Sequence, residues 1–546
     1  MKSLKVERTF SKGIAIAPAF VVNNLELKAD NTEVKDASIE KDFFSKAVEA
    51  ASLDLEVLAK QNDIFAAHID LIQDPSLEES VFSFIDEGLN AESAVERAIK
   101  EIAEEFESIE DEYLMARAAD MRDIGKRIMQ KLKGVSDNPF ENLKSHVIVV
   151  ASDLTPSDTA NMDFNLVDGF ITEKGGVTSH VCIIARSLNI PAIVGAEGIM
   201  DAVKDGDVIA FDALLGEIEI SPDEATLESY KLRKDEFEQQ EKLLLERASG
   251  KSVTKDGKEI LVCANVGSIE DIENSLKYNP DGVGLFRTEF LYMHSSDFPT
   301  EDEQFAVYKK AAELLDGKEL IIRTLDIGGD KGLPYFDFGN ELNPFLGYRA
   351  IRICLDKPEV FRAQMRALLR ASAFGNIKIM YPMIASEKEL LSANAIAKKC
   401  MSELDDEGIA YNKDIKIGMM METPAATIMA DVFAKHVDFF SIGTNDLTQY
   451  TLAVDRGNEK ISYLYDSFEP SVLRSIKRII DCGHKEGIPV GMCGEFASDK
   501  NAFPILLGMG LDEFSMSASA IPEIKSAVCE SSYELSSENA QMFNFV

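Results

Sequence analysis

Paired cysteines are absent from the sequence. Its 546 residues include seven cysteines, an odd number, with no Cys-x-x-Cys pair and no cluster of histidine and cysteine. A disulfide framework requires paired cysteines and a structural zinc site requires closely spaced ligands, so the sequence disfavours both. Apart from Cys493, we expect the thiols to be buried and chemically inert. These are Cys182, Cys263, Cys354, Cys400, Cys482 and Cys529.

The sequence also lacks the segments that direct a chain to a membrane. Its first residues show no basic-then-apolar signal pattern, and no apolar run approaches the length that crosses a bilayer. Positive charge is scarce as well, because 57 lysines and arginines stand against 95 aspartates and glutamates, a formal charge of −38. This balance disfavours nucleic acid and anionic membranes and favours a partner with a basic face. We therefore expect a cytoplasmic protein with no membrane insertion.

Glycine and proline are rare between Val34 and Lys133, where Pro75, Gly88 and Gly125 are the only examples. Apolar residues recur at helical spacing through this stretch, which predicts an all-helical block arranged as two helical hairpins. His68 lies on one of these apolar helical stretches, where packing is the ordinary use of a histidine, and a position in a helical docking face is its one functional alternative.

Strands are predicted on both sides of the helical block. Residues 1–22 suggest two short strands around Gly13 and Pro18, and further strands are expected at His146–Val150, Gly169–Thr172, Pro191–Val194 and Val208–Phe211. Two short strands cannot fold alone, so we expect them to return to the later ones, with the helical block inserted into one α/β domain. The predicted domains are an α/β domain (1–22 plus 144–221), a helical insert (23–143), a linker helix (222–250) and a C-terminal domain (251–546).

The linker helix is predicted to start at Ser221-Pro222-Asp223-Glu224, which supplies a cap, a first-turn proline and acidic residues. It is charged on most faces, as is typical of a spacer between two bodies, and it is a candidate swivel.

The C-terminal part alternates short apolar strands with helical segments, in eight units. Eight such units predict a (β/α)8 TIM barrel, with an open doubly wound sheet as the alternative. The strands are expected at Ile260–Asn265, Val283–Phe286, Leu320–Leu325, Ile377–Met383, Ile417–Met421, Phe439–Ile442, Pro489–Met492 and Phe514–Met516.

The stretch Gly175-Gly176-Val177-Thr178-Ser179-His180 joins a glycine hinge to two hydroxyl residues and a histidine, and an apolar run follows it. This pattern predicts a short helix with His180 in its first turn. Unpaired N–H groups and the helix dipole would stabilise a phosphate carried there, and imidazole is both nucleophilic and largely neutral near pH 7. The alternative is that His180 only caps or packs a helix.

Polar residues follow several of the predicted barrel strands, where barrel enzymes keep their active residues. Arg287 and Arg323 end two strands, and Arg349 and Arg456 stand nearby. Four arginines could bind a small, multiply charged anion through forked contacts, or each could pair with a barrel carboxylate. Beside the carboxylates of the same strand ends, they point to a phosphate site.

Glu422 and Asp446 follow neighbouring strands and offer hard oxygen ligands. Two carboxylates with substrate oxygens and water are the usual way to hold Mg²⁺, although salt bridges to the arginines are an equal alternative. Cys493 precedes Gly494, which would let a substrate approach, so its thiol could give or take a proton. Otherwise Cys493 is a buried, inert cysteine.

The sequence resembles the phosphoenolpyruvate-protein phosphotransferases, the enzyme I family of the bacterial sugar phosphotransferase system. The resemblance runs nearly end to end. Its most specific blocks are Gly175–Gly195, Gly282–Met293, Asn343–Arg352, Asp438–Gly457 and Gly491–Glu495.

The resemblance implies a phosphohistidine intermediate at His180, with Thr159 as a hydrogen-bonding neighbour, in an α/β domain that swivels. It implies that Mg²⁺ is held by Glu422 and Asp446 and that Cys493 protonates the enolate carbon to release pyruvate. The helical insert would dock the histidine phosphocarrier protein HPr, and the barrel would form a homodimer. Phosphoenolpyruvate would be bound by Arg287, Arg323, Arg349, Asn445, Asp446 and Arg456.

The sequence departs from the family at two positions beside the histidine. Val177 stands where the family usually has arginine, and Val181 where it has a small residue, and neither change removes a reacting group. Because no sensor domain precedes Met1, we expect the sugar branch of the family rather than its nitrogen-regulatory branch.

Two rival functions remain at this point. A pyruvate-phosphate dikinase or phosphoenolpyruvate synthase shares the swivelling histidine and the barrel, but carries an ATP-binding domain that 546 residues leave no room for. A non-catalytic regulatory homologue would keep the fold and only bind partners. Loss of a site residue would indicate such a regulator, and none is lost.

Overall fold

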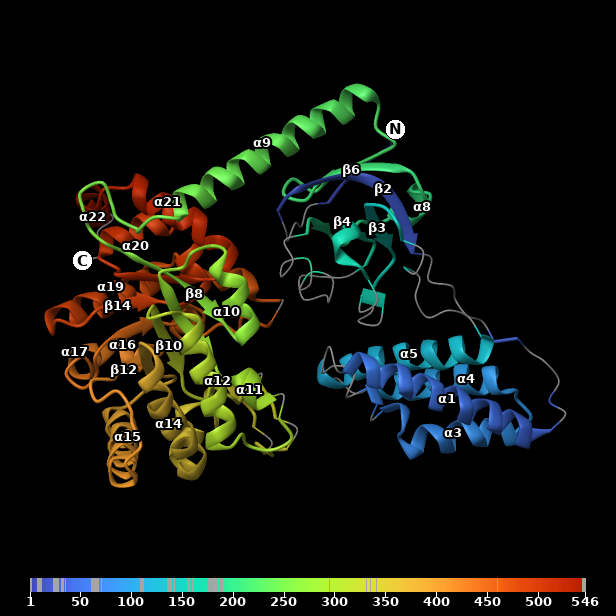
Figure 1. The fold of residues 1–546 in the computed structure, drawn as a ribbon, viewed down its shortest axis with the longest axis horizontal. Helices are drawn as coiled ribbons and strands as arrows, with labels where there is room; N and C mark the ends of the chain where they lie inside the picture. Colours follow the sequence, from blue (N-terminus) through green and yellow to red (C-terminus); the bar gives the residue numbers. More distant parts are fainter. Residues whose placement is uncertain are drawn as a thin grey trace. The chain divides into compact units, whose positions relative to one another are not determined.

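A computed structural model describes the chain from Lys2 to Met542 with interruptions. It divides into two compact units, Met1–Gln240 and Glu241–Val546, shown from blue to green and from green to red in Figure 1. The residues outside the description within this span are 7–11, 23–28, 31–33, 35, 60–67, 70, 109–111, 135–139, 141–142, 155–157, 160–161, 175–181, 183–184, 186–189, 294, 330, 334, 340 and 459.

The first unit contains a seven-stranded sheet in the order β1-β7-β6-β2-β3-β4-β5. Strands from before and after the helical block are thus joined in one sheet, as predicted. Successive residues of β3 are all buried and divide between two apolar clusters, so both faces of the sheet are covered. The strands are β1 (Lys2–Lys5), β2 (Ile14–Val22), β3 (Val147–Ala151), β4 (Val167–Thr172), β5 (Ala192–Ile193), β6 (Val208–Asp212) and β7 (Glu217–Ile220).

Pro18 marks the position where β2 changes partners. Ile14–Pro18 pair with β6 in the antiparallel sense, and Ala19–Val22 pair with β3 in the parallel sense. Because proline has no N–H to donate, it suits the residue between the two ladders. The described part of residues 1–22 thus contains the two predicted strands, and the second, β2, runs through Pro18 as one nine-residue strand.

The described residues between β2 and β3 contain four long helices, which pack on a common core that includes Phe44, Leu55, Val81 and Ile124. Figure 1 shows α1, α3, α4 and α5 lying side by side. Asp74 caps α3 by accepting a hydrogen bond from the N–H of Ser76. No helix within the described ranges is long and apolar enough to cross a membrane. The helices are α1 (Ala37–Ala59), α3 (Pro75–Asp86), α4 (Ala91–Ser108) and α5 (Glu112–Lys133).

The linker helix α9 spans Glu224–Ala248. It starts later than predicted, because Asp223, and not Ser221, accepts the capping hydrogen bond from the N–H of Thr226, at 2.8 Å. Its first half lies against the sheet, where Tyr230 is buried and Arg233 pairs with Asp212. At its other end the amide of Asn279 donates to the carbonyls of Ala248 and Ser249.

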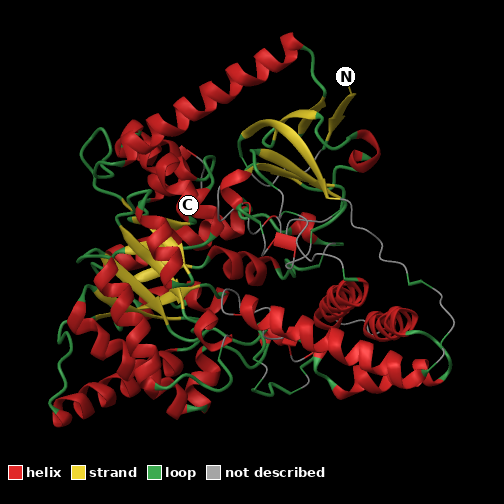
Figure 2. Cartoon of the chain, turned by 45° about the vertical axis from the view of Figure 1, so that its right-hand side comes forward, coloured by secondary structure: helices red, strands yellow, loops and turns green. Residues whose placement is uncertain are grey.

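The second unit is a closed barrel of eight parallel strands, which confirms the predicted TIM barrel and excludes the open sheet. Figure 2 shows the strands enclosed by helices. All eight predicted strands are present. They are β8 (Leu261–Val266), β9 (Gly282–Arg287), β10 (Glu319–Arg323), β11 (Ile377–Tyr381), β12 (Lys416–Met421), β13 (Phe440–Ile442), β14 (Val490–Met492) and β15 (Glu513–Met516).

The helices of the barrel unit pack their apolar faces on the outside of these strands and complete the largest core of the chain. They are α10 (Ile269–Leu276), α11 (Glu289–Met293), α12 (Glu301–Leu314), α13 (Ile351–Asp356), α14 (Pro358–Ala371), α15 (Glu387–Glu407), α16 (Pro424–Ile428), α17 (Ala430–Phe433), α18 (Thr444–Leu452), α19 (Pro470–Lys485), α20 (Phe503–Met509), α21 (Ile521–Glu530) and α22 (Tyr533–Met542).

Candidate active site

A cavity of about 960 Å³ opens at the carboxyl ends of the barrel strands. Its wall is strongly polar, although each strand that leads to it is apolar. Eight of the candidate residues line it: Arg287, Arg323, Arg349, Glu422, Asn445, Asp446, Arg456 and Cys493.

The floor of the cavity is an apolar plug inside the barrel. Leu285, Ile321, Met380, Met420 and Phe439 form this cluster together with Cys493. Branched and apolar side chains filling the interior are usual for a barrel of eight strands, which is a packed core and not a pore. The plug keeps water out from below.

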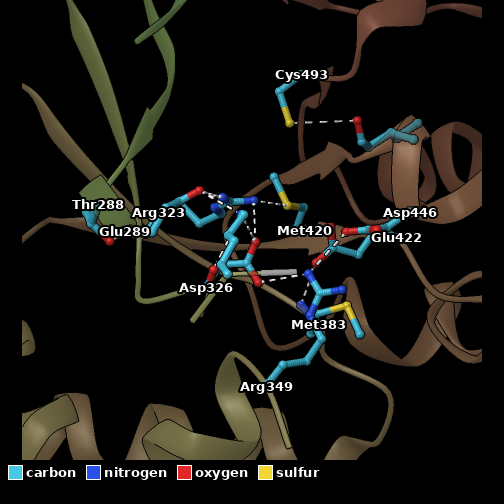
Figure 3. Close-up of polar contacts among 12 residues, drawn as sticks. Thr288, Glu289, Arg323, Asp326, Arg349, Met383, Met420, Glu422, Asp446 and Cys493 are labelled. Atoms are coloured by element: carbon cyan, nitrogen blue, oxygen red, sulfur yellow. Dashed lines mark hydrogen bonds and ion pairs between the residues drawn. The ribbon is translucent and has the colours of Figure 1, made fainter. Parts of the chain in front are cut away.

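Cys493 directly follows β14, and its side chain is 97% buried against this plug. Its Sγ lies 3.8 Å from the carbonyl oxygen of Ile442 (Figure 3). Burial raises the pKa of the thiol to about 11, although Ser441 and Arg323 oppose the shift. The thiol therefore holds its proton at neutral pH, as a general acid must.

Arg323 ends β10 and forms the centre of an ion-pair network (Figure 3). It lies 2.6 Å from Glu289 and 2.9 Å from Asp326, and all three side chains are almost fully buried. Burial alone would raise the pKa of Asp326, but Arg323, Lys331 and Arg349 hold it well below its usual value. Arg323 thus makes the ion pairs that the sequence offered as an alternative, and it also lines the cavity proposed to bind an anion.

Arg349 connects Asp326 to the metal-site candidate Asp446. Its Nη2 atom lies 3.1 Å from Asp326 and 3.5 Å from Asp446, and its Nη1 donates to the hydroxyl of Tyr450. The Nε atoms of Arg323 and Arg349 are both buried and have no hydrogen-bond partner in the described part of the chain. Both arginines also line the polar cavity, where their forked guanidinium groups suit an anionic ligand.

Lys331 belongs to the same network but was not predicted. Its Nζ donates to Glu289 at 2.8 Å and to Asp326 at 3.2 Å, and it lines the cavity. It lies in the loop after β10, several residues beyond the strand end, so no strand pattern points to it. Tyr450 was missed for a related reason, since it comes from the helix α18 and not from a strand end.

Glu422 follows β12 and is 98% buried. Its Oε1 accepts a hydrogen bond from the backbone N–H of Met383 at 2.6 Å. Burial, and then the nearby charges of Asp446 and Asp326, raise the pKa of Glu422 to about 8. In the free protein this carboxyl is mostly neutral at pH 7.

The residues present fit a divalent cation held by two protein carboxylates. Asp446 Oδ1 is buried and has no hydrogen-bond partner in the described residues, while Oδ2 faces Arg349. Glu422 repels Asp446 when both are ionised, and a cation between them would relieve that repulsion. The described residues contain no group of three or more carboxylate, histidine or cysteine side chains that could hold a metal ion alone. Oxygens of the substrate or of water must complete such a site.

The remaining candidates form the rim of the cavity. Arg287 ends β9 and is half-buried, whereas Arg456 is exposed in the loop after α18. Asn445 lies in the first turn of α18, and its Oδ1 accepts a 3.4 Å hydrogen bond from the N–H of Glu495.

Two glycines are required for this geometry. A Cβ at Gly494 would lie 1.7 Å from Thr444 Oγ1, and one at Gly443 would lie 2.8 Å from Glu422 Oε2. No side chain can occupy the first position without moving the start of α18, and a side chain at the second would displace the Glu422 carboxylate.

His180 and the two departures beside it, Val177 and Val181, lie outside the described residues. Thr159 is described and is buried in the first unit, next to Asp158, which pairs with Lys126 of α5 at 3.0 Å. His68 is buried in the helical block beside Asp120 and Asp123, in agreement with a packing role.

The sequence matches three descriptions of protein families: "PEP-utilising enzyme, PEP-binding domain" over 242–533, "PEP-utilising enzyme, N-terminal" over 8–117 and "PEP-utilising enzyme, mobile domain" over 143–216. It is 45% identical to the phosphoenolpyruvate-protein phosphotransferase of Priestia megaterium, over 95% of this chain and 92% of that protein. It is 44% identical to the protein of the same name from Bacillus subtilis (strain 168), over 98% of this chain and 95% of that protein. The solution structure of "Enzyme I (nEIt)" covers 43% of this chain and 99% of its own, with 39% identity and a TM-score of 0.38.

Proposed function

The chain belongs to the phosphoenolpyruvate-protein phosphotransferase family, and we propose that it transfers the phosphoryl group of phosphoenolpyruvate first to His180 and then to the phosphocarrier protein HPr. The observation that carries this proposal is the barrel cavity, where four arginines, a carboxylate pair and a protonated thiol meet. The family relationship favours this function over a dikinase, a synthase or a non-catalytic regulator.

The arginines provide the binding site for the substrate. Phosphoenolpyruvate carries a carboxylate and a phosphate, and forked guanidinium groups bind both kinds of oxygen well. Arg323 and Arg349 line the interior of the cavity, and Arg287 and Arg456 close the rim. Asn445 and Asp446, at the start of α18, complete the contacts.

Enzymes of this family use a metal ion, and we propose Mg²⁺ held by Glu422 and Asp446. Bound there, it would neutralise charge on the phosphate oxygens. The protein's own contribution is to fix the two carboxylates: the N–H of Met383 holds Glu422, and Arg349 holds one oxygen of Asp446. Metal binding must displace the proton of Glu422.

In the reaction, the bond between phosphorus and the enol oxygen breaks, and a bond forms between phosphorus and a ring nitrogen of His180. The enolate left behind takes a proton at C3 from Cys493 Sγ and becomes pyruvate, and the thiolate is later reprotonated from solvent. The transferred group needs little covalent help from the protein, so correct positioning and charge stabilisation supply most of the catalysis. Ketonisation of the enol makes the step strongly favourable.

The helical block is the proposed docking site for HPr. Asp42, Glu49, Glu78 and Glu79 are exposed on α1 and α3, and they would attract a carrier with a basic face. His180 serves both the barrel cavity and the carrier, so the α/β domain must swivel, with α9 as part of the hinge. We also propose that the barrel forms a homodimer and that the protein acts in the cytoplasm.

Labelling with radioactive phosphoenolpyruvate tests the proposal. In the presence of Mg²⁺ the full chain should acquire one acid-labile label, and His180→Ala should acquire none. The matched control is His146→Ala, which removes an exposed histidine paired with Asp168 in the same unit. Full labelling of the His180→Ala variant, or a label that depends on ATP, would contradict the proposed function.

A further inference from the structure

The loop that carries Cys493 is held from both sides of β14. On the β13 side, the N–H of Cys493 donates to Ile442 O at 3.1 Å, and Gly494 packs against Thr444. On the other side, Asn265 Nδ2 donates to the carbonyl oxygen of Cys493 at 2.9 Å. Asn265 comes from β8, two strands away in the barrel order, and reaches across β15.

The orientation of the Asn265 amide is set by Ser515 of β15. Ser515 Oγ donates to Asn265 Oδ1 at 2.6 Å, while Asn265 Nδ2 also lies 3.4 Å from the Ser515 carbonyl oxygen. If the amide were reversed, its oxygen would face two carbonyl oxygens, neither of which can donate. One orientation therefore satisfies all three contacts.

A glycine leaves the room that Ser515 needs. A Cβ at Gly284, on β9 at the far side of β8, would lie 2.5 Å from Ser515 Oγ. Ser515 is fully buried, so its hydroxyl cannot exchange its contact with Asn265 for water.

Hydrogen bonds to both the N–H and the C=O of Cys493 fix the two peptide planes that flank its Cα. They therefore fix the direction of the Cα–Cβ bond, and only rotation about that bond remains for Sγ. Proton transfer to carbon requires the donor within a fraction of an ångström of its working position. We propose that Asn265, oriented by Ser515, is a positioning residue for the Cys493 thiol in the protonation of the enolate.

This inference depends on the proposed function, and the experiment separates the two. Asn265→Asp keeps the shape but places an oxygen against the Cys493 and Ser515 carbonyls. The matched control is Asn394→Asp, which makes the same change at a helix residue whose amide donates to the carbonyl of His436, at 3.1 Å. Both variants are mixed as full chains with Mg²⁺ and excess phosphoenolpyruvate, in a single turnover.

We expect Asn265→Asp to lower the maximal rate of pyruvate formation by about 10–100-fold, since a small misplacement of a reacting group has an effect of this order. The half-saturating phosphoenolpyruvate concentration and the rate of His180 labelling should change less than about twofold, because the arginines are not touched. Asn394→Asp should match the wild type throughout.

The stereochemistry of protonation distinguishes a positioning role of Asn265 from a purely structural one, because loss of stability alone would not change the face that is protonated. With phosphoenolpyruvate deuterated at one C3 position and tritiated water as solvent, a positioned thiol delivers its hydrogen to one face and gives a chiral methyl group. A misplaced thiol lets the enol escape and ketonise in solution, which gives a racemic methyl group. We expect the chirality to be retained in wild type and lost in Asn265→Asp.

Unchanged rate and chirality in Asn265→Asp would overturn the inference, and so would equal losses of labelling and pyruvate formation. If wild type itself shows no His180 label, the proposed function fails instead.

If Asn265→Asp does not fold, Ser515→Ala decides the matter, because it only frees the amide to turn. Its pyruvate rate should fall about threefold, with partial racemisation, as loss of one neutral hydrogen bond suggests. Full chirality in Ser515→Ala would overturn the inference as well.

Discussion

The backbone N–H of Met383 donates to Glu422 Oε1 at 2.6 Å, between the ends of two neighbouring barrel strands. Met383 has a φ of +57°, a region that costs an L residue about 1–2 kcal/mol. This strained residue directs its N–H at one carboxylate oxygen, and Oε2 lies beside Gly443 at the cavity. The protein thus orients a carboxylate that burial keeps mostly protonated.

Metal binding should become tighter as the pH rises through about 8, because the cation must displace the Glu422 proton. The raised pKa also affects stability. Without metal, the neutral Glu422 carboxyl contributes favourably to the free energy of unfolding. This contribution is fully present below the pKa of an unfolded glutamate, about 4.3. It is lost as the pH rises through about 8, the pKa of Glu422 in the folded protein. Glu422→Gln should therefore raise the unfolding temperature of the metal-free chain at pH 8.5 by roughly 2–4 °C.

Glu513→Gln is the matched control for this test. Glu513 is buried at the opposite end of the barrel, and burial and then Glu319 raise its pKa to about 8 as well. Thermal unfolding at pH 6 and pH 8.5, with and without Mg²⁺, separates the two. Both variants should gain stability at pH 8.5, and only Glu422→Gln should lose the extra stabilisation by Mg²⁺. Equal responses to Mg²⁺ would remove Glu422 from the metal site.

Cys493→Ala should slow pyruvate formation by about 100-fold or more, the usual contribution of a general acid. The phosphoenolpyruvate concentration for half-saturation should stay the same, because the thiol does not bind the phosphate. Because burial raises the pKa of Cys493 to about 11, the wild-type rate should show no alkaline decline due to this thiol below about pH 10. Cys529→Ala serves as the control; its thiol is exposed and that of Cys482 is half-buried, so the expectation that all other thiols are buried is wrong for these two. Unchanged turnover in Cys493→Ala would show that another group supplies the proton.

Lys331→Met should weaken phosphoenolpyruvate binding by about tenfold, an energy of about 1.4 kcal/mol, because it removes a cation from the cavity. It should also lower the stability, since Glu289 and Asp326 each lose a partner. Lys309→Met makes the same change outside the cavity, at a half-buried lysine of α12 that lies 3.7 Å from Glu313. Binding is measured from the rate of His180 labelling at a series of phosphoenolpyruvate concentrations. Equal affinities in the two variants would leave Lys331 outside the site.

Reversing charge on the helical block should affect the carrier only. Glu49 and Glu78 are exposed on the rim of a hollow of about 470 Å³, whose apolar floor includes Phe44 and Ile72. In the double variant Glu49→Lys with Glu78→Lys, phosphorylation of HPr should slow by about tenfold or more at low salt, while His180 labelling stays unchanged. The control makes two like changes on α9, Glu238→Lys with Glu241→Lys. A variant equally poor in both steps would move the docking surface elsewhere.

The barrel was predictable because its strands are short apolar runs, several of which are followed directly by a polar residue. That signal also gave the cavity residues, since a barrel gathers strand ends on one face. The prediction was too long at β11, which was expected to reach Met383 but ends at Tyr381. Pro382 cannot donate to the ladder, and the positive φ of Met383 then takes the chain out of the strand.

Contacts made by loops and across layers were not predictable in this way. Lys331 has no local pattern that distinguishes it, because it lies in a loop and its partner Glu289 is distant in the sequence. Asn265 ends a predicted strand, but its partners Cys493 and Ser515 come from other parts of the barrel. β7 was missed although Glu217–Ile220 alternate charged and apolar residues, because four residues are too short for a period of two to stand out.

The placement of β2 has a consequence for how the chain folds during its synthesis on the ribosome. β2 finds its two neighbours only in β3 and β6, and β6 ends at Asp212. At about 5–20 residues per second, β2 waits roughly ten to forty seconds for β6 to be translated. During that interval the helices α1, α3, α4 and α5, whose contacts are local, can fold while Ile14–Val22 stay unpaired and open to chaperones.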